Sequence, residues 1–253
     1  MRKAPLSNLV RYCDTLLKTA AVQDYEGAVN GLQVENNGSV TRIAAAVDAS
    51  LATVRMAIDS GADLLIVHHG LFWSPSHPWT GRRYELMKLL LDNNLAVYSS
   101  HLPLDVHPKL GNNVLLAKAL GFRGLKPFFF TKGAYLGFQT VTDVSRETLV
   151  SRLAKAVGGE PKLLPGGPKT CRKIGVVTGG AGAEVRLAAA EGVDTFITGE
   201  GPHWTFALAE ELCVNVLYGG HYATETFGVR ALAAHLSAKY GVPHSFLDHP
   251  SGL

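Results

Sequence analysis

The sequence has few cysteines and no long basic or hydrophobic run, and each absence narrows the class of protein. Three of the 253 residues are cysteine, and none lies in a CxxC pair. This leaves no spacing typical of a thiolate metal site and favours a reducing compartment. The formal net charge of +3 gives no support to a nucleic-acid partner. With no membrane-length segment and no signal-peptide pattern visible, we expect a cytoplasmic protein without membrane contact.

The composition is that of a globular protein with enough apolar residues for a sizeable core. Hydrophobic residues make up 47% and charged residues 18% of the chain. Strand and helix patterns alternate on both sides of about residue 130, which indicates an α/β fold with two related lobes and mostly parallel sheets. We assign residues 1–126 and 221–253 to the first lobe and residues 127–220 to the second.

The clearest local pattern is a βαβ unit, with a strand at 41–47, a helix at 51–60 and a strand at 62–67. Residues 162–169, rich in Pro, Gly and Lys, indicate an exposed connection. Further strands are expected at 95–99, 134–142, 172–178, 195–198, 214–218 and 244–247. Further helices are expected at 5–20, 83–92, 114–120, 145–157, 184–191 and 205–212, and a long one ends near residue 239.

Two adjacent histidines, His68 and His69, directly follow the strand 62–67 and precede Gly70. Ligands gather beyond the carboxyl ends of strands in α/β sheets, so this pair is well placed for a metal. Because strand side chains alternate in direction, the two rings could reach two different ions. The alternative is a strand that simply stops at polar residues.

Two further predicted strand ends carry the same kinds of side chain. His101 and Asp105 follow one, and His221 and Glu225 follow another. The last pair is spaced i, i+4 and shares a helix face. Pro103 makes the spacing from His101 to Asp105 non-helical, so a common direction is not assured. Imidazole and carboxylate are ligands of Zn, Fe, Mn, Co and Ni.

Each residue alone has a structural alternative. Glu225 suits the first turn of a helix, and His221 suits a helix cap. His101 could support its strand end, or it could support the ligand residues without binding the metal itself. Three such clusters at three strand ends together favour a site for two metal ions, in which Glu225 could bridge and Asp105 could bind one ion terminally.

Three other segments leave two readings open. The loop 71–79, with Trp73 and Trp79, could be a lid or rim, or a surface loop anchored by its aromatics. The glycine-rich segment 178–182 could hold a phosphate, but a tight βα turn fits it better. Glu200 and His203 could act as acid–base groups or be structural polar residues.

Several segments resemble the signatures of the NIF-three-like family, whose members are often labelled GTP cyclohydrolase I type 2 homologues. The resemblance spans nearly the whole chain. One departure is that some relatives have His-His where this chain has His203-Trp204. The matching segments are His68-His69-Gly70, His101-Leu102-Pro103-Leu104-Asp105, Gly111-Asn112-Asn113, Gly220-His221-Tyr222-Ala223-Thr224-Glu225, Asn30-Gly31-Leu32-Gln33-Val34 and Thr198-Gly199-Glu200.

The resemblance implies a two-lobed α/β protein in a hexameric ring, with a dinuclear metal site facing an internal cavity. Its ligands fall on His68, His69, Asp105, His221 and Glu225, with Glu225 bridging the ions.

The expected function is metal-dependent hydrolysis, with a nucleotide such as GTP as the substrate implied by the family label. His101 and Glu200 are candidates for moving protons. The rival hypothesis is a non-enzymatic metal carrier or regulatory scaffold. Phe128–Phe130, Phe72-Trp73 and Trp79 could cover subunit contacts or pack within one chain.

Overall fold

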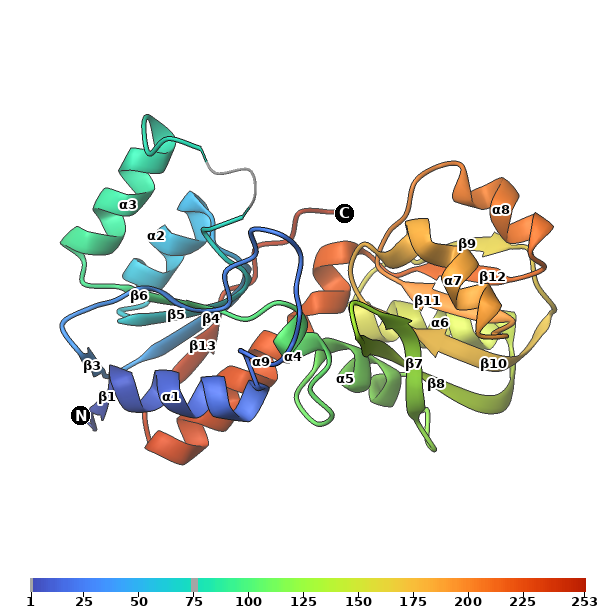
Figure 1. The fold of residues 1–253 in the computed structure, drawn as a ribbon, viewed down its shortest axis with the longest axis horizontal. Helices are drawn as coiled ribbons and strands as arrows, with labels where there is room; N and C mark the ends of the chain where they lie inside the picture. The colour runs from blue at the N-terminus through green and yellow to red at the C-terminus, as the bar shows by residue number, and fades with distance from the viewer. Residues whose placement is uncertain (1, 74–76) are drawn as a thin grey trace. The chain divides into compact units, whose positions relative to one another are not determined.

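The chain forms two α/β units, each with its own sheet (Figure 1). The computed structural model describes residues 2–73 and 77–253. Unit 1 contains residues 1–104 and 228–249, and unit 2 contains residues 105–227 and 250–253. The predicted division placed residues 105–126, 221–227 and 250–253 in the first lobe instead. The structure places 105–126 in unit 2, where Leu116, Ala117 and Leu120 lie in the core of the six-stranded sheet.

The sheet of unit 1 has five strands in the order β13-β4-β5-β6-β2. Three of its four pairings are parallel, and β2 is antiparallel to β6. A separate antiparallel pair joins β1 and β3. The strands of unit 1 are β1 (Ala4–Pro5), β2 (Gly31–Val34), β3 (Ser39–Val40), β4 (Ile43–Asp48), β5 (Leu64–His69), β6 (Ala96–Ser99) and β13 (His244–Phe246).

Helices cover both faces of this sheet. In Figure 1, α2 (Leu51–Asp59) and α3 (Arg82–Asp92) lie on one face, while α1 (Leu6–Leu17) and the later part of α9 (His221–Tyr240) lie on the other. Because both faces are buried, the central strands are continuously apolar: residues 43–47 and 64–67 are all at most 2% exposed.

The sheet of unit 2 has six strands in the order β7-β8-β10-β11-β12-β9, and it corrects one expectation. Only two of its five pairings are parallel, so this sheet is mixed and not mostly parallel. Its strands are β7 (Lys126–Thr131), β8 (Ala134–Ser145), β9 (Lys162–Pro165), β10 (Thr170–Val176), β11 (Thr195–Thr198) and β12 (Asn215–Tyr218). Its helices, besides the start of α9, are α5 (Asn112–Ala119), α6 (Arg146–Val157), the 3-10 helix η1 (Ala181–Glu184), α7 (Val185–Ala190) and α8 (Thr205–Glu211).

Three antiparallel pairings, made by β7, β8 and β9, account for that difference. The segment 162–169, expected to be an exposed connection, begins with β9, which pairs antiparallel with β12 at the edge of the sheet. The phenylalanine segment belongs to β7, which forms a hairpin with β8 across Lys132 and Gly133. Both turn residues have positive φ, 50° and 75°, as a two-residue hairpin turn requires. Phe128 and Phe129 are buried, whereas Phe130 is 53% exposed.

The two units share a topology, which confirms that the lobes are related. Unit 1 runs β4-α2-β5-α3-β6, and unit 2 runs β10-α7-β11-α8-β12, each with three parallel neighbouring strands. In each unit an earlier strand, β2 or β9, adds antiparallel to the last strand of this series. The α/β class predicted from the sequence is therefore confirmed.

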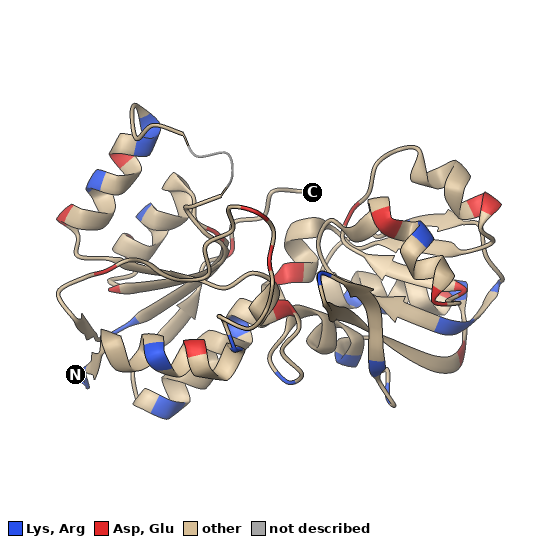
Figure 2. Ribbon diagram, in the orientation of Figure 1, with Lys and Arg blue, Asp and Glu red and all other residues tan. Residues whose placement is uncertain are grey.

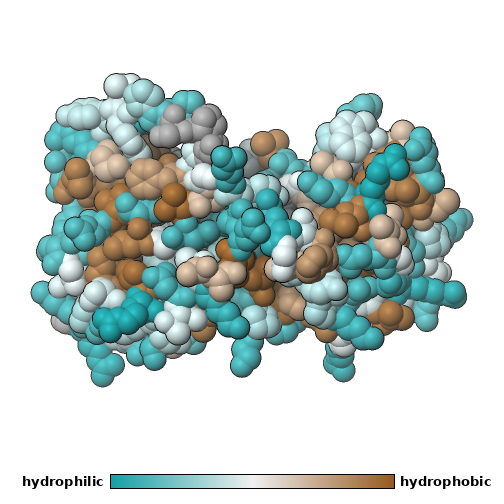
Figure 3. All heavy atoms as spheres, viewed as in Figure 1, coloured by the Kyte–Doolittle hydropathy of each residue, from teal (hydrophilic) through white to brown (hydrophobic). Residues whose placement is uncertain are grey.

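Charged residues of both signs are interspersed along the described parts of both units (Figure 2). In the view of Figure 3, apolar surface areas are interrupted by hydrophilic side chains. Within residues 2–73 and 77–253, no helix has the length and apolar character needed to cross a membrane.

Candidate functional site

Three imidazoles meet in unit 1 at the carboxyl ends of β5 and β6. One ring nitrogen from each of His68, His69 and His101 lies within 4.8 Å of the others. The ring centroid of His68 lies 4.8 Å from those of both His69 and His101. These strands are parallel neighbours, so their carboxyl ends share one edge of the sheet. The sequence placed these residues at strand ends, and the structure brings their side chains together.

The structure corrects one detail of the histidine pair. The strand was expected to end at residue 67, but β5 continues through His69, which pairs with Asp48 of β4. Strand alternation predicted that the two rings diverge, yet they lie 4.8 Å apart. His69 is the last strand residue, and a hydrogen bond from its Nδ1 to Asp48 Oδ1, 2.7 Å long, holds its ring.

Each ring of this cluster is oriented through Nδ1. His68 Nδ1 donates to the carbonyl oxygen of Ser100 at 3.0 Å, and His101 Nδ1 donates to Asp24 Oδ1 at 2.8 Å. With the bond of His69 to Asp48, all three rings follow the pattern of metal-binding histidines, whose second nitrogen bonds to a carbonyl or carboxylate. At His68 and His69, Nε2 is then the atom that a metal would use.

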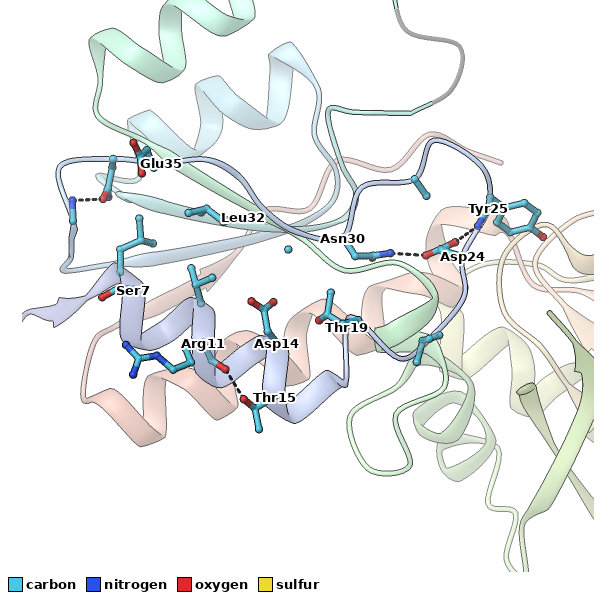
Figure 4. A pocket seen from close by; sticks show the side chains of 18 residues that line it. Ser7, Arg11, Asp14, Thr15, Thr19, Asp24, Tyr25, Asn30, Leu32 and Glu35 are labelled. Carbon is cyan, nitrogen blue, oxygen red and sulfur yellow. Dashed lines mark hydrogen bonds between the residues drawn. The ribbon is translucent and has the colours of Figure 1, made fainter. Parts of the chain in front are cut away.

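Asp24 belongs to the same site, although no pattern in the sequence points to it. Its side chain is only 6% exposed and accepts hydrogen bonds from His101 Nδ1 and the backbone N–H of Leu102. It also accepts from Asn30 Nδ2 and the backbone N–H of Tyr25 (Figure 4). Burial alone would raise the pKa of Asp24, but the hydrogen bond and charge of His101, with the other donors, lower it to about 2. A charged Asp24 therefore holds the loop before β2 against His101.

Asn30 also joins the loop before β2 to His101, because its Oδ1 accepts the backbone N–H of His101 at 2.7 Å. Asp24, Tyr25 and Asn30 also line a cavity of about 1070 Å³ that lies between α1 and the segment leading into β2 (Figure 4).

In unit 2, His221 and Glu225 lie one turn apart at the start of α9. His221 Nε2 is 3.2 Å from Glu225 Oε2, and His221 Nδ1 donates to Glu200 Oε1 at 2.7 Å. Burial would lower the pKa of His221, but the hydrogen bonds and charges of Glu225 and Glu200 raise it to about 9. The structure thus brings together three of the residues selected from the sequence: Glu200, His221 and Glu225. His203 is exposed.

The glycine-rich segment after β10 packs against this group. Gly179 has φ +72°, and a Cβ built on it would lie 2.2 Å from Glu225 Oε1. At Gly180 a Cβ would meet only ordinary contacts, the nearest at 3.5 Å from His221. The segment is therefore a close-packed turn whose glycine at 179 leaves room for the Glu225 carboxylate.

Asp105 ends a short helix, α4 (Leu102–Asp105), and is 6% exposed. The expected non-helical spacing after Pro103 is wrong, because a proline fits within the first turn, where its missing N–H costs no helical hydrogen bond. Asn112 Nδ2 donates to Asp105 Oδ1 at 2.8 Å. Asn113 is buried and bonds to Thr178, which precedes Gly179.

Comparisons with known proteins agree over almost the whole chain. The family model Duf34/NIF3 (NGG1p interacting factor 3) matches residues 4–251. A "GTP cyclohydrolase 1 type 2 homolog" of Halobacterium salinarum is 44% identical, covering 96% of this chain and 97% of that protein. The protein of the same name from Deinococcus radiodurans is 40% identical, covering 97% of this chain and 93% of the relative.

A solved structure agrees in fold as well as in sequence. The protein TTHA1606 from Thermus thermophilus superposes with a TM-score of 0.90 at 38% identity, covering 99% of this chain and 100% of that one. The chain belongs to the Duf34/NIF3 (NGG1p interacting factor 3) family.

Proposed function

We propose that this protein is a hydrolase dependent on two divalent transition-metal ions per chain. The proposed ligands are His68, His69, Asp105, His221 and Glu225, with Zn, Fe, Mn, Co and Ni as the candidate metals. Bound ions of this kind lower the pKa of coordinated water and stabilise oxyanion charge.

The observation that carries the proposal is the histidine cluster of unit 1. Three imidazoles with ring nitrogens within 4.8 Å of one another repel each other when protonated. Each is nevertheless oriented by an acceptor at Nδ1: a carbonyl oxygen at His68 and carboxylates at His69 and His101. This arrangement leaves Nε2 of His68 and His69 available to a cation, while His101 lies beside them.

The donors of unit 2 fit the same chemistry. Glu225 is 4% exposed at its side chain and lies beside His221. A buried carboxylate next to an imidazole supplies an oxygen and a nitrogen ligand from one helix turn. Glu200 bonds His221 Nδ1 and is half-exposed, so it can hold the ring and exchange protons with solvent. We assign proton transfer to Glu200 and His101.

The substrate that we propose is a nucleotide, with opening of its purine ring as the reaction suggested by the names of the relatives. The test is steady-state turnover of GTP and of a phosphoester panel by metal-loaded protein. We expect many turnovers per chain, and a loss of at least about 100-fold in kcat in His68→Gln, whose imidazole is a proposed ligand. Product formation that never exceeds one equivalent per chain contradicts an enzyme.

A metal carrier is the second candidate, and the accessibility of two proposed ligands favours it. The side chains of His69 and His221 are 25% and 29% exposed, so bound ions can exchange with an acceptor. Transfer of ions to an apo-protein acceptor without turnover supports the carrier.

We also propose that the chain assembles into a homohexameric ring and acts in the cytoplasm. Closed symmetry is the usual arrangement of homo-oligomers. Light scattering coupled to size exclusion tests the ring, and we expect a mass six times that of the 27.0 kDa chain. A monomer mass at all concentrations contradicts it.

A further inference from the structure

Two exposed aromatic side chains flank the histidine cluster of unit 1. The indole of Trp73 lies 4.9 Å from the ring of His101 and 6.2 Å from that of His69, perpendicular to both. The ring of Tyr25 lies 5.8 Å from His101 at a tilt of 50°. His101 therefore has an aromatic neighbour from each of two loops.

Both aromatics keep much of their surface in solvent. Trp73 is 39% exposed and Tyr25 is 48% exposed. Single exposed apolar residues are common on protein surfaces and need no explanation. Here, however, two of them converge on one imidazole, and rings that served only as packing would be expected to bury more of their area.

Hydrogen bonds hold the backbone beside each of these rings. The backbone N–H of Tyr25 donates to the buried Asp24 carboxylate at 2.7 Å, and Figure 4 shows the ring at the tip of this loop. The segment just before Trp73 is held by Gln33, whose side-chain oxygen accepts the N–H of Leu71 at 2.7 Å. The two loops also meet directly, because Val29 N–H donates to the carbonyl of Phe72 at 3.4 Å.

We infer that Trp73 and Tyr25 form an aromatic rim that stacks a planar heteroaromatic ring beside the imidazole cluster. The inference rests on the proposed function and narrows it, because the protein would recognise its substrate through the aromatic ring of that substrate. Stacking on aromatic side chains is tolerant of ring type but requires a flat π-face, which a sugar phosphate lacks. Rings held by anchored loops also lose little conformational freedom on binding.

The test measures binding to the full chain after metal removal, by titration calorimetry with guanosine 5′-monophosphate and with ribose 5-phosphate. We expect the nucleotide to bind at least about tenfold more tightly than the sugar phosphate. Trp73→Leu and Tyr25→Leu should each weaken nucleotide binding by roughly 10- to 100-fold. Trp73→Phe keeps a stacking face and should retain most of the affinity.

The matched control is Tyr84→Leu, since Tyr84 is 60% exposed on α3 of the same unit. It should bind the nucleotide as the wild type does, and melting curves check that all variants fold. Undetectable binding of the nucleotide, equal binding of the two probes, or unchanged affinity in both leucine variants of the rim overturns the inference. Because the protein is metal-free, failure of the hydrolase proposal leaves this outcome unaffected.

Discussion

The Nδ1 atom of His101 lies 2.8 Å from Oδ1 of Asp24, although 77 positions of the sequence separate the two residues. This bond joins the loop before β2 to the end of β6. It fixes which nitrogen of His101 faces His68 and His69, and the same bond and the charge of His101 lower the pKa of Asp24.

Asp24→Asn should lower the stability of the fold at neutral pH by about 2 kcal/mol, as expected from a carboxyl pKa that falls from 3.8 to about 2 on folding. A depressed carboxyl pKa contributes stability that is complete above the unfolded pKa, near 4, and is lost as the pH falls towards 2. The variant should therefore lose less stability than the wild type between about pH 4 and pH 2. Urea unfolding at several pH values measures this.

Asp143→Asn is the matched control, because Asp143 is 76% exposed at its side chain and bonds Arg172 on the surface. We expect a change of less than about 0.5 kcal/mol. Parallel acid dependence in Asp24→Asn and the wild type contradicts the role given to Asp24.

Glu225→Gln should weaken metal binding more than His101→Gln. A bridging carboxylate offsets the repulsion between two ions. Loss of a residue that supports the ligands without binding the metal typically costs about 10- to 100-fold in metal affinity. Competition with a chelator, run side by side, gives the ranking. Equal metal loss in the two variants refutes it.

Gly179→Ala should weaken metal binding by about tenfold or more, whereas Gly180→Ala should not. A methyl group at 179 would lie 2.2 Å from Glu225 Oε1, while one at 180 meets its nearest atom at 3.5 Å. Thermal unfolding of both variants measures the loss of stability from backbone strain at the positive φ of Gly179. That loss is then compared with the loss of metal affinity, which reports displacement of Glu225. Matching metal affinities in the two alanine variants argue against the packing described.

Asn113→Ala should destabilise the protein by about 2–3 kcal/mol, since it leaves buried polar groups without partners. Asn113 Nδ2 donates to the carbonyl of Leu136 at 2.7 Å, and its Oδ1 accepts the N–H of Thr178 at 2.6 Å. Asn93→Ala, on the exposed end of α3, removes a side-chain hydrogen bond to Leu89 and should cost less than about 1 kcal/mol. Urea unfolding measures both variants. Equal unfolding midpoints for Asn113→Ala and Asn93→Ala would argue that the buried hydrogen bonds of Asn113 contribute little to stability.

The central strands were predictable because their burial on both faces produces continuous apolar runs. The strand expected at 195–198 matches β11, and the βαβ unit from β4 to β5 is present. The strand expected at 244–247 matches β13, an edge strand of unit 1. The edge strands of unit 2 were not predictable in this way. β9 contains Lys162 and Pro165, which an edge strand tolerates, and its partner β12 lies far along the chain.

The candidate ligands could be proposed from the sequence because each follows an apolar strand or starts a helix. The residues that contact and orient the site side chains could not. Asp48 faces His69 only through the register of β4 with β5, which local patterns do not reveal. Asp24 lies in a loop with no periodicity, and only the fold brings it to His101. Gly179 looks like an ordinary turn glycine until Glu225 is placed beside it.

The most direct test of the proposed metal site is elemental analysis of the full-length protein, purified without chelator and then reloaded separately with Zn, Mn, Fe, Co and Ni. We predict close to two ions per chain for at least one metal, falling to one or fewer in Glu225→Gln. A stoichiometry near zero for every metal would contradict the site and the hydrolase built on it.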